Sequence, residues 1–207
     1  TEGRGQMGRI WFAEPGSHLS MSIIHHPGFL PVSELPVLGM NVSLGIVRAV
    51  KSFNPSLTPL IKWPNDIYVL EKKLCGILIE NSLAGGRVQH SIIGIGMNIN
   101  ETRFPADLPN AISLRMITCT EYEVEGIARK ITEEVMSAMQ QPYQHWKDEY
   151  DQFVFGKGQS FQFESGSTAF HAIVTGVSIE GKLILKMKDG KFESFSTHEV
   201  KWMVKGG

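Results

Sequence analysis

The stretch from residue 61 to residue 80 constrains the fold more strongly than any other part of the chain. It reads IKWPNDIYVLEKKLCGILIE, so a short apolar run ends at a proline and a second apolar run follows. Pro64 has no backbone donor and restricts the residue before it, which predicts that the first strand ends there. Asn65 and Asp66 are then expected in a turn, and residues 74–80 are expected to form the returning strand.

Charged and polar side chains gather at the mouth of this predicted hairpin. Lys62 and Asn65 precede the return, and Lys73 stands where it can point back toward Asp66. Asn-Asp turns and flanking lysines are also ordinary features of hairpins that have no catalytic role. Each residue alone therefore favours a structural interpretation, whereas their combination points to a site.

Composition narrows the classes of protein that the chain can represent. Its 207 residues allow one large domain, or a medium domain with a small appendage. The 20 basic and 21 acidic side chains give no bulk positive charge for binding nucleic acid. Cys75 and Cys119 are too few for a disulfide framework and form no metal-binding motif, which favours a reducing, cytoplasmic setting. No apolar run reaches the roughly 18 residues of a membrane span, and no signal peptide is expected.

The N-terminal sequence GRGQMG at residues 3–8 satisfies the GxGxxG pattern of dinucleotide-binding turns. That interpretation needs a strand before the glycines and a helix after them. Instead, residues 10–13 and 19–24 are predicted to form a β-hairpin. A glycine loop that carries Arg4 and Arg9 can wrap an anion through its amides and guanidinium groups, and a mobile surface loop is the alternative. Because nothing precedes the loop to anchor it, we expect the N-terminus to be incomplete.

The middle of the chain alternates between helical and extended patterns. Apolar residues recur every three or four positions over residues 35–53, which predicts an amphipathic helix. Residues 91–100 read SIIGIGMNIN, a buried strand whose glycines indicate a close approach or tight packing. Residues 101–119 are expected to be irregular. A capping box at residues 120–123 is predicted to open a second amphipathic helix that ends near Pro142.

The periodicity changes from helical to alternating after Trp146, and we place a domain boundary near residue 152. Glycines at the pairs Ser165-Gly166, Glu180-Gly181 and Asp189-Gly190 predict three turns between short strands. Four or five such strands suggest a small barrel of the SH3-like kind. The absence of a basic stripe disfavours nucleic acid as its ligand.

These segments resemble, in order, the signature motifs of the biotin protein ligases. The matching segments are GRGQMGRIW at residues 3–11, KWPND at 62–66, KLCGIL at 73–78, IGIGMNIN at 93–100 and HEVK at 198–201. Gln6 stands where that family commonly has arginine. The resemblance implies an α+β fold: a mixed sheet with helices, similar to class II aminoacyl-tRNA synthetases, over residues 1–151, and an SH3-like barrel over residues 152–207.

The resemblance also implies a reaction. Biotin and ATP, with Mg²⁺, would give biotinyl-5'-AMP and pyrophosphate, and the biotin would then pass to a lysine of a biotin carboxyl carrier protein or domain. The implied catalytic residues are Lys73, Asp66, Arg4 and Arg9. The implied biotin contacts are Gly3, Arg4, Gly5, Gly76 and Leu78. The implied nucleotide contacts are Arg9, Trp11, Lys62, Asn65, Lys73 and Asn98, and no cluster in the sequence identifies metal ligands.

Charge explains why these residue types suit such a reaction. Two anions, a carboxylate and an α-phosphate, must be brought together, which is a task for lysine and arginine. We expect Lys73 to bridge them and Asp66 to orient or deprotonate the acceptor lysine.

Two alternatives remain open from the sequence. The first is a lipoate or octanoate ligase of the same superfamily. The second is a noncatalytic binding or regulatory protein, which Gln6 and the lack of the family's upstream biotin-contacting segment favour. A homodimer formed through a sheet edge is a further option, and no DNA-binding module is expected.

Overall fold

The computed structural model describes residues 3–4, 10–11, 16–27, 30–141 and 143–203. Its larger sheet contains five strands in the order β3-β7-β6-β5-β4. Their bounds are His18–His25 for β3, Leu60–Lys62 for β4, Asp66–Val69 for β5, Lys72–Ala84 for β6 and Arg87–Asn98 for β7. All pairs within this sheet are antiparallel, so the expected mixture of parallel and antiparallel strands is not found among the described strands.

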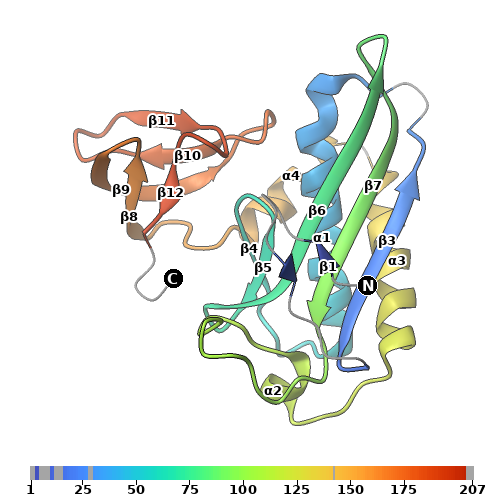
Figure 1. Cartoon of the computed structure of the whole chain (residues 1–207). Coiled ribbons are helices and arrows are strands. Elements are labelled where there is room, and N and C mark those ends of the chain that lie inside the picture. The colour runs from blue at the N-terminus through green and yellow to red at the C-terminus, as the bar shows by residue number, and fades with distance from the viewer. Residues whose placement is uncertain (1–2, 5–9, 12–15, 28–29, 142, 204–207) are drawn as a thin grey trace.

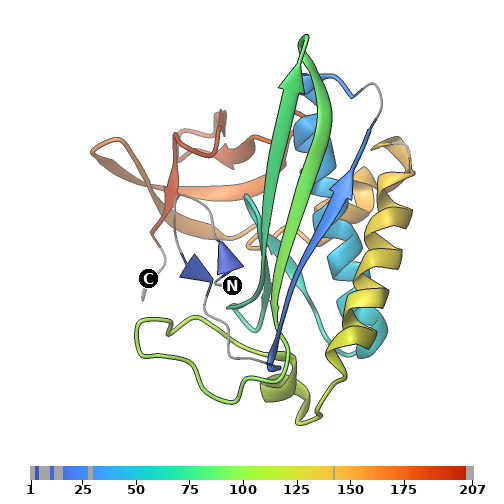
Figure 2. The ribbon, with the colours of Figure 1, turned by 45° about the vertical axis from the view of Figure 1, so that its right-hand side comes forward.

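Two helices cover one face of this sheet, α1 (Leu35–Phe53) and α3 (Val124–Met139), as Figures 1 and 2 show. The bounds of α1 are those that the apolar spacing predicts. Gly45 allows the two helices to touch, since a Cβ there would lie 2.5 Å from the Cα of Val135. The core lies between these helices and the sheet, and it includes Leu44, Ile46, Ile95 and Met97.

Strand β5 corrects the prediction for Asp66. Asp66 does not lie in a turn: it begins β5, which pairs with β4 on one side and β6 on the other. The turn that follows uses positive φ at Leu70 (51°) and Glu71 (60°), conformations that favour glycine or asparagine. Because neither residue is typical of such a turn, the sequence gives no local signal for it.

The predicted N-terminal hairpin is also wrong. Strand β2 (Ile10–Trp11) pairs with β1 (Gly3–Arg4), with Gly3 opposite Trp11. Strand β3 pairs with β7 instead. Residues 12–13 of that prediction lie outside the described residues. The glycine-arginine segment is therefore flanked by a short two-stranded ribbon of its own.

The three helices after α1 differ from the predictions in where they begin or end. The predicted capping box is absent: α3 is capped at Glu123 without a side-chain hydrogen bond. Asn100 bonds both the N–H and the C=O of Tyr122 just before it. A short helix α2 (Leu114–Thr118), capped by Ser113, occupies part of the segment expected to be irregular. Helix α4 (Tyr143–Gln152) continues past the point where the sequence indicated alternation.

The C-terminal residues form a second antiparallel sheet in the order β11-β10-β9-β8-β12. Its strands are β8 (Ser160–Ser165), β9 (Thr168–Val177), β10 (Leu183–Lys186), β11 (Phe192–Phe195) and β12 (Lys201–Trp202). The three predicted turns are confirmed, because Gly166, Gly181 and Gly190 all have positive φ between strands or at a strand end. The described residues thus form an α+β protein with two five-stranded antiparallel sheets and the small β1–β2 ribbon.

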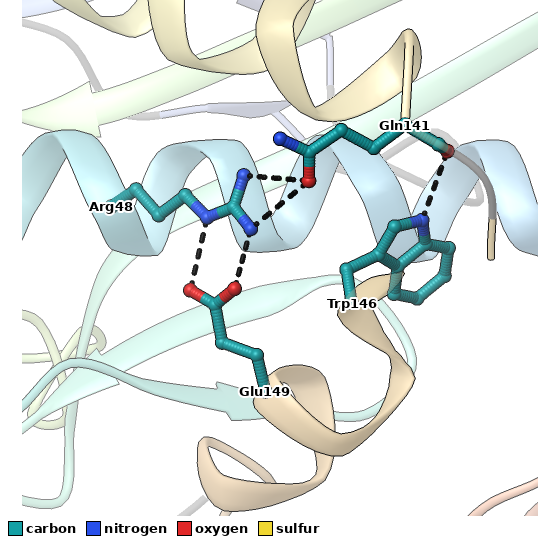
Figure 3. A network of polar contacts seen from close by, with 4 residues as sticks. All are labelled: Arg48, Gln141, Trp146 and Glu149. Atoms are coloured by element: carbon teal, nitrogen blue, oxygen red, sulfur yellow. Dashed lines mark hydrogen bonds and ion pairs between the residues drawn. The ribbon is translucent and has the colours of Figure 1, made fainter. Parts of the chain in front are cut away.

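Specific contacts join the two sheets. The indole N–H of Trp63 donates to the carbonyl of Gly181 at 2.8 Å. Residues 61 and 154 form a parallel bridge. Helix α4 is tied to α1 by Arg48, whose guanidinium binds the carboxylate of Glu149 (Figure 3). Within the described residues, no helix combines the length and apolar character that crossing a membrane requires.

Candidate active site

The two faces of the five-stranded sheet carry different side chains. On the face away from α1 and α3, Gly76 pairs with Gly96 and Leu78 pairs with Gly94. Ser20 lies opposite Gly96 on the next strand. This surface, the open face, is therefore lined in its middle by glycine, serine and one leucine. Small residues let another molecule approach the backbone closely.

Trp11 covers one end of the open face, and we call this end the Trp11 corner. A Cβ on Gly96 would lie 2.7 Å from the indole ring, and one on Gly76 would lie 2.9 Å from it. Real side chains cannot approach that closely, so both positions require glycine while the ring occupies this place. The glycine strand indicated either tight packing or a close approach by a backbone or a ligand; the structure shows tight packing against the Trp11 ring, and the approach of a ligand stays a prediction. No described residue accepts a hydrogen bond from the buried Nε1 of Trp11.

Lys73 and Asp66 meet beside this indole. The Nζ of Lys73 lies 2.7 Å from the Oδ1 of Asp66 and 5.4 Å from the centre of the Trp11 ring. About a third of the Lys73 side chain and a fifth of the Asp66 side chain are exposed, so the pair is accessible. The prediction that Lys73 points back toward Asp66 is confirmed.

A β-bulge explains how Lys73 reaches the open face. Residues three apart on a regular strand point to opposite faces, which would place Lys73 and Gly76 apart. Ile67 pairs with Cys75, but the next residue of β5 pairs with Lys73, so Leu74 is an extra residue in β6. A bulge of this kind re-aims the neighbouring side chain. Leu74 and Cys75 are both fully buried, and Lys73 turns to the open side.

Hydrogen bonds from a neighbouring loop hold the backbone of Lys73. Its N–H donates to the carbonyl of Asn110 at 2.6 Å, and its carbonyl accepts from the N–H of Ile112 at 3.0 Å. Asn98, which is 4% exposed, donates its amide to the carbonyls of both Lys73 (3.4 Å) and Ile112 (3.1 Å). The structure therefore places Asn98 as a support for Lys73, and its contact with a nucleotide stays a prediction.

Asn65 has a similar place in the loop between β4 and β5. Its side-chain amide donates to the carbonyl of Ile77 at 2.7 Å, and its own carbonyl accepts from the N–H of Ile77 at 2.9 Å. This double contact fixes the KWPND loop against β6, directly beside Gly76. A contact between Asn65 and a nucleotide is likewise still a prediction.

Lys62 lies in an aromatic cage that the sequence did not indicate. Its Nζ donates to the hydroxyl of Tyr68 at 3.1 Å and lies 4.5, 5.9 and 5.7 Å from the ring centres of Tyr68, Phe155 and Trp202. Burial lowers the pKa of Lys62, Asp66 opposes that shift, and Lys73 adds to it. Burial, with Asp66, raises the pKa of Tyr68 to about 12. Because the cage residues come from three distant segments, no local motif predicts them.

The structure locates part of the glycine-arginine segment. Gly3 and Arg4 belong to β1, whose ribbon lies on the side of the sheet opposite the helices (Figure 2). Gly5 and Arg9 lie outside the described residues, and nothing is assigned to the side chain of Arg4. Their predicted roles with biotin and ATP therefore stay predictions.

Metal ligands were not identified from the sequence, and the described residues hold no group of three or more His, Cys, Asp or Glu side chains arranged to bind a metal ion. Cys75 is buried on the helix-covered side, where burial raises the pKa of its thiol. Cys119 is exposed, and both thiols are free.

The first comparison with known proteins is with a model of a protein family. Residues 1–98 match the family model described as "Biotin/lipoate A/B protein ligase family". These residues hold the Trp11 corner and the Lys73–Asp66 pair. This part of the chain is therefore similar to the biotin/lipoate A/B protein ligase family.

The individual relatives are ligases by name. The chain is 28% identical to the bifunctional ligase/repressor BirA of Bacillus subtilis, over 92% of this chain and 60% of that protein. It is 25% identical to the biotin--[acetyl-CoA-carboxylase] ligase of Paracoccus denitrificans, over 91% of this chain and 82% of that protein. The chain thus spans about 60% of the length of the Bacillus relative. Its resemblance to the biotin protein ligases is confirmed.

Solved structures confirm the fold. The biotin protein ligase from Aquifex aeolicus in complex with biotin and ATP superimposes with a TM-score of 0.80 at 23% identity, over 98% of this chain and 84% of that chain. The ligase from Leishmania major in complex with biotinyl-5-AMP gives a TM-score of 0.62 at 24% identity, over 95% and 85% of the two chains. The arrangement of two antiparallel sheets with helices on one face is therefore the fold of these ligases.

Proposed function

We propose that the open face joins biotin and ATP as biotinyl-5'-AMP and then passes biotin to a lysine of a biotin carboxyl carrier protein or domain. The observation that carries this proposal is the accessible Lys73–Asp66 pair beside Trp11, at 2.7 Å and next to a glycine-lined surface. The surface can take a flat ligand, and the corner offers a cation and a carboxylate for the two chemical steps. The names of the relatives and of their bound ligands support biotin and ATP as substrates.

In the first step, a carboxylate oxygen of biotin attacks the α-phosphorus of ATP, and the bond to the departing pyrophosphate breaks. The reacting groups are both anionic, so a positioned cation stabilises the transition state. We assign this task to Lys73, which exchanges Asp66 for the carboxylate and the α-phosphate when the substrates bind. Arg4 and Arg9 add positive charge from the glycine segment.

In the second step, the amine of the acceptor lysine attacks the acyl carbon, and AMP leaves. The attacking amine must first lose a proton, because an ammonium group has no free electron pair. Asp66, released from Lys73 by the first step, orients the ammonium group and accepts its proton. One ion pair thus supplies the cation for activation and the carboxylate for transfer.

Substrate contacts follow from the positions on the open face. Gly76 and Leu78 are assigned to the rings of biotin, together with Gly3 and Gly5 of the glycine segment. Trp11 is assigned to the adenine side of the nucleotide because its ring closes the corner and its Nε1 has no described partner. Asn98, Asn65 and Lys62 complete the nucleotide side in this proposal.

Mg²⁺ is proposed to arrive bound to the phosphates of ATP, since this cation prefers phosphate and water oxygens to a protein cage. The described residues hold no cluster suited to a resident metal, so we derive no step through a metal site.

The finer architecture is part of the proposal as well. We assign residues 1–151 to a catalytic domain similar to class II aminoacyl-tRNA synthetases and residues 152–207 to an SH3-like barrel; the short antiparallel strands β8 to β12 support the second assignment. The two free thiols support a cytoplasmic setting. Strand β3 is an edge of the described sheet and could pair with a second copy in a homodimer.

A lipoate or octanoate ligase is the second candidate, because the matching family model covers biotin and lipoate ligases alike. ATP–pyrophosphate exchange separates the candidates when biotin, lipoate and octanoate are supplied in turn. We expect exchange with biotin alone. Exchange with lipoate or octanoate would identify that acid as the substrate. Binding of biotin and ATP without exchange would indicate a noncatalytic protein.

A further inference from the structure

Lys62 belongs to the open face, because it lies in one row with the residues at the centre of that face. Lys62 pairs with Asp66, Asp66 pairs with Gly76, and Gly76 pairs with Gly96 across neighbouring strands. Residues directly opposite one another in antiparallel strands point to the same side of the sheet, with Cβ atoms roughly 4.5–5.5 Å apart. Lys62 is therefore the neighbour of Asp66 on the side away from the glycines.

Asp66 thus lies between two lysines. The Nζ of Lys73 forms an ion pair with it at 2.7 Å. Lys62 faces it from β4 and interacts with it electrostatically: burial lowers the pKa of Lys62, and the negative charge of Asp66 opposes that shift. In the proposed first step Lys73 turns to the biotin carboxylate and the α-phosphate, which leaves Asp66 beside two newly arrived anions. Lys62 is a cation that remains next to it.

The aromatic cage restricts where the ammonium group of Lys62 can lie. Its Nζ is 4.5, 5.9 and 5.7 Å from the ring centres of Tyr68, Phe155 and Trp202, and ring faces attract a cation. The Tyr68 hydroxyl, at 3.1 Å, is the one hydrogen-bond partner of Nζ among the described residues. Within the same part of the chain, Asp66 is the one carboxylate that acts on the charge of Lys62. This charge is therefore available to Asp66.

A packing role alone does not explain a lysine at this position. Enclosing an ammonium group among rings removes part of its hydration, which costs free energy. A methionine of similar length would fill the same space without that cost. The cage therefore indicates that the charge itself has a use.

The backbone fixes Phe155 beside Lys62. The N–H of Ile61 donates to the carbonyl of Phe153 at 2.6 Å, and the N–H of Phe155 donates to the carbonyl of Ile61 at 2.9 Å. Residues 153–155 thus extend the sheet past β4, next to the strand that carries Lys62.

Trp202 brings the C-terminal sheet into the cage. It lies on β12, opposite Phe163 of β8. Its ring centre is 5.8, 5.1 and 4.9 Å from those of Phe155, Phe161 and Phe163. The packing of these three phenylalanines therefore holds the indole where it closes the cage over Lys62.

We propose that Lys62 is a positioning residue for biotin transfer: it holds the carboxylate of Asp66 in place once Lys73 has turned to the substrates, and Trp202 keeps Lys62 there from the C-terminal sheet. This inference rests on the proposed role of Asp66. The acceptor lysine then meets a carboxylate that is already in position, and its ammonium group loses a proton to that carboxylate before the amine attacks. Lys62 keeps its own proton throughout.

The first test uses the whole chain and preformed biotinyl-5'-AMP, so that transfer to a biotin carboxyl carrier domain is measured without ATP. Lys62→Met should slow single-turnover transfer about tenfold at saturating carrier domain, with little change in the carrier concentration that gives half the maximal rate. Lys62→Arg keeps a cation in the cage and should recover most of the lost rate. The melting temperature of Lys62→Met should be equal or higher, because methionine packs without losing hydration. Normal transfer in Lys62→Met would overturn the proposal, and a raised KM for ATP in that case would make Lys62 a nucleotide contact instead.

A double variant tests whether Lys62 acts through Asp66. Lys62→Met combined with Asp66→Asn should transfer within about twofold of the rate of Asp66→Asn alone, because a residue that acts through another has no effect once the other is gone. If Lys62→Met slows the double variant as much as it slows the unsubstituted protein, Lys62 acts independently and the proposal is contradicted. Normal transfer in Asp66→Asn alone would refute the role of Asp66 in the proposed function. Slow transfer in Asp66→Asn with normal transfer in Lys62→Met would refute this inference alone.

The contribution of Trp202 is tested in the same assay. Trp202→Leu removes a ring from the cage and should slow transfer several-fold, whereas Trp202→Phe keeps a ring and should slow it less. The loss in Trp202→Leu should disappear when Lys62→Met is already present. Phe192→Leu, at a position of β11 that is 64% exposed, is the matched control and should transfer normally. Normal transfer in Trp202→Leu would contradict the contribution of Trp202; should that variant not fold, the Lys62 variants decide the proposal.

Discussion

The two faces of strands β6 and β7 differ although they are made by alternate residues of the same segments. Toward the helices, Ile77, Ile93, Ile95 and Met97 are at most 4% exposed and belong to the core. Toward the open side, the same strands present glycines, Leu78 and Lys73. The first face gives the sheet its stability, and the second leaves room for the proposed substrates.

The difference shows how one sheet supports both tasks. Burying large apolar side chains on one face stabilises the fold enough for the other face to remain uncovered. The rigid strands then hold a surface of small residues in place, and a single bulge at Leu74 brings a lysine onto it. Substitutions on the two faces should therefore have separate consequences, one for stability and the other for activity.

The largest expected effect is on stability. Ile95→Ala removes a buried side chain from the helix-covered face and should lower the free energy of unfolding by about 2–4 kcal/mol. Its matched control, Ile24→Ala, changes a residue that is 65% exposed and should alter stability by less than about 0.5 kcal/mol. Urea denaturation of both variants measures this. Equal destabilisation by the two would mean that the faces do not differ as described.

The next effect concerns transfer. Asp66→Asn keeps the shape of the side chain but removes its charge, so transfer of biotin from preformed adenylate should slow roughly a hundred-fold. Asp107→Asn, in an exposed loop, is the control and should have no effect. Single-turnover transfer of labelled biotin to a carrier domain measures both. If Asp66→Asn transfers at the normal rate, Asp66 does not act on the acceptor amine.

A smaller effect is expected where Trp11 meets the glycines. Gly96→Ala places a Cβ 2.7 Å from the indole and should displace it, weakening ATP binding about tenfold through lost stacking. In Gly94→Ala the added Cβ meets only Leu78, at 3.3 Å from its carbonyl oxygen and 3.7 Å from its Cβ, so this variant should bind ATP nearly as well as the unsubstituted protein. Calorimetry with ATP compares them. Similar affinities in the two variants would show that the Trp11 corner is not the nucleotide side.

The smallest effect depends on pH, at the aromatic cage. Tyr68 has its pKa raised to about 12, so between pH 10 and 12 the unfolded chain ionises this phenol before the folded chain does. The stability that Tyr68 contributes is thus fully present below pH 10 and is lost as pH rises toward 12. The stability advantage over Tyr68→Phe should shrink across that window by on the order of 1–2 kcal/mol. Denaturation of both proteins at pH 9 and 11 tests this, and parallel pH profiles would contradict it.

Local patterns predict much of this fold. The apolar spacing over residues 35–53 gives α1 its observed bounds, and the turn glycines at 166, 181 and 190 are in the expected conformation. Both signals are local, since helix periodicity and positive φ depend on neighbouring residues. The Lys73–Asp66 contact was predictable for the same reason, because a hairpin brings nearby residues together.

The missed features depend on distant residues. The turn at Leu70 and Glu71 joins two strands that pair within the sheet, and the backbone of Tyr122, just before α3, is held by two hydrogen bonds with the side chain of Asn100. The cage around Lys62 combines Phe155 and Trp202 with a residue of β5. No local pattern in the sequence encodes these contacts, and the cage forms only when the two sheets pack together.

Biotin-dependent ATP–pyrophosphate exchange, compared in the Lys73→Ala and Lys72→Ala variants, tests the assignment of the open face most directly. The two lysines are neighbours on β6, but Lys73 carries the ion pair with Asp66, whereas Lys72 is exposed. We predict that Lys73→Ala lowers the exchange rate roughly a hundred-fold or more and that Lys72→Ala keeps it within about twofold. Normal exchange in Lys73→Ala would contradict the proposed activation of biotin at this corner.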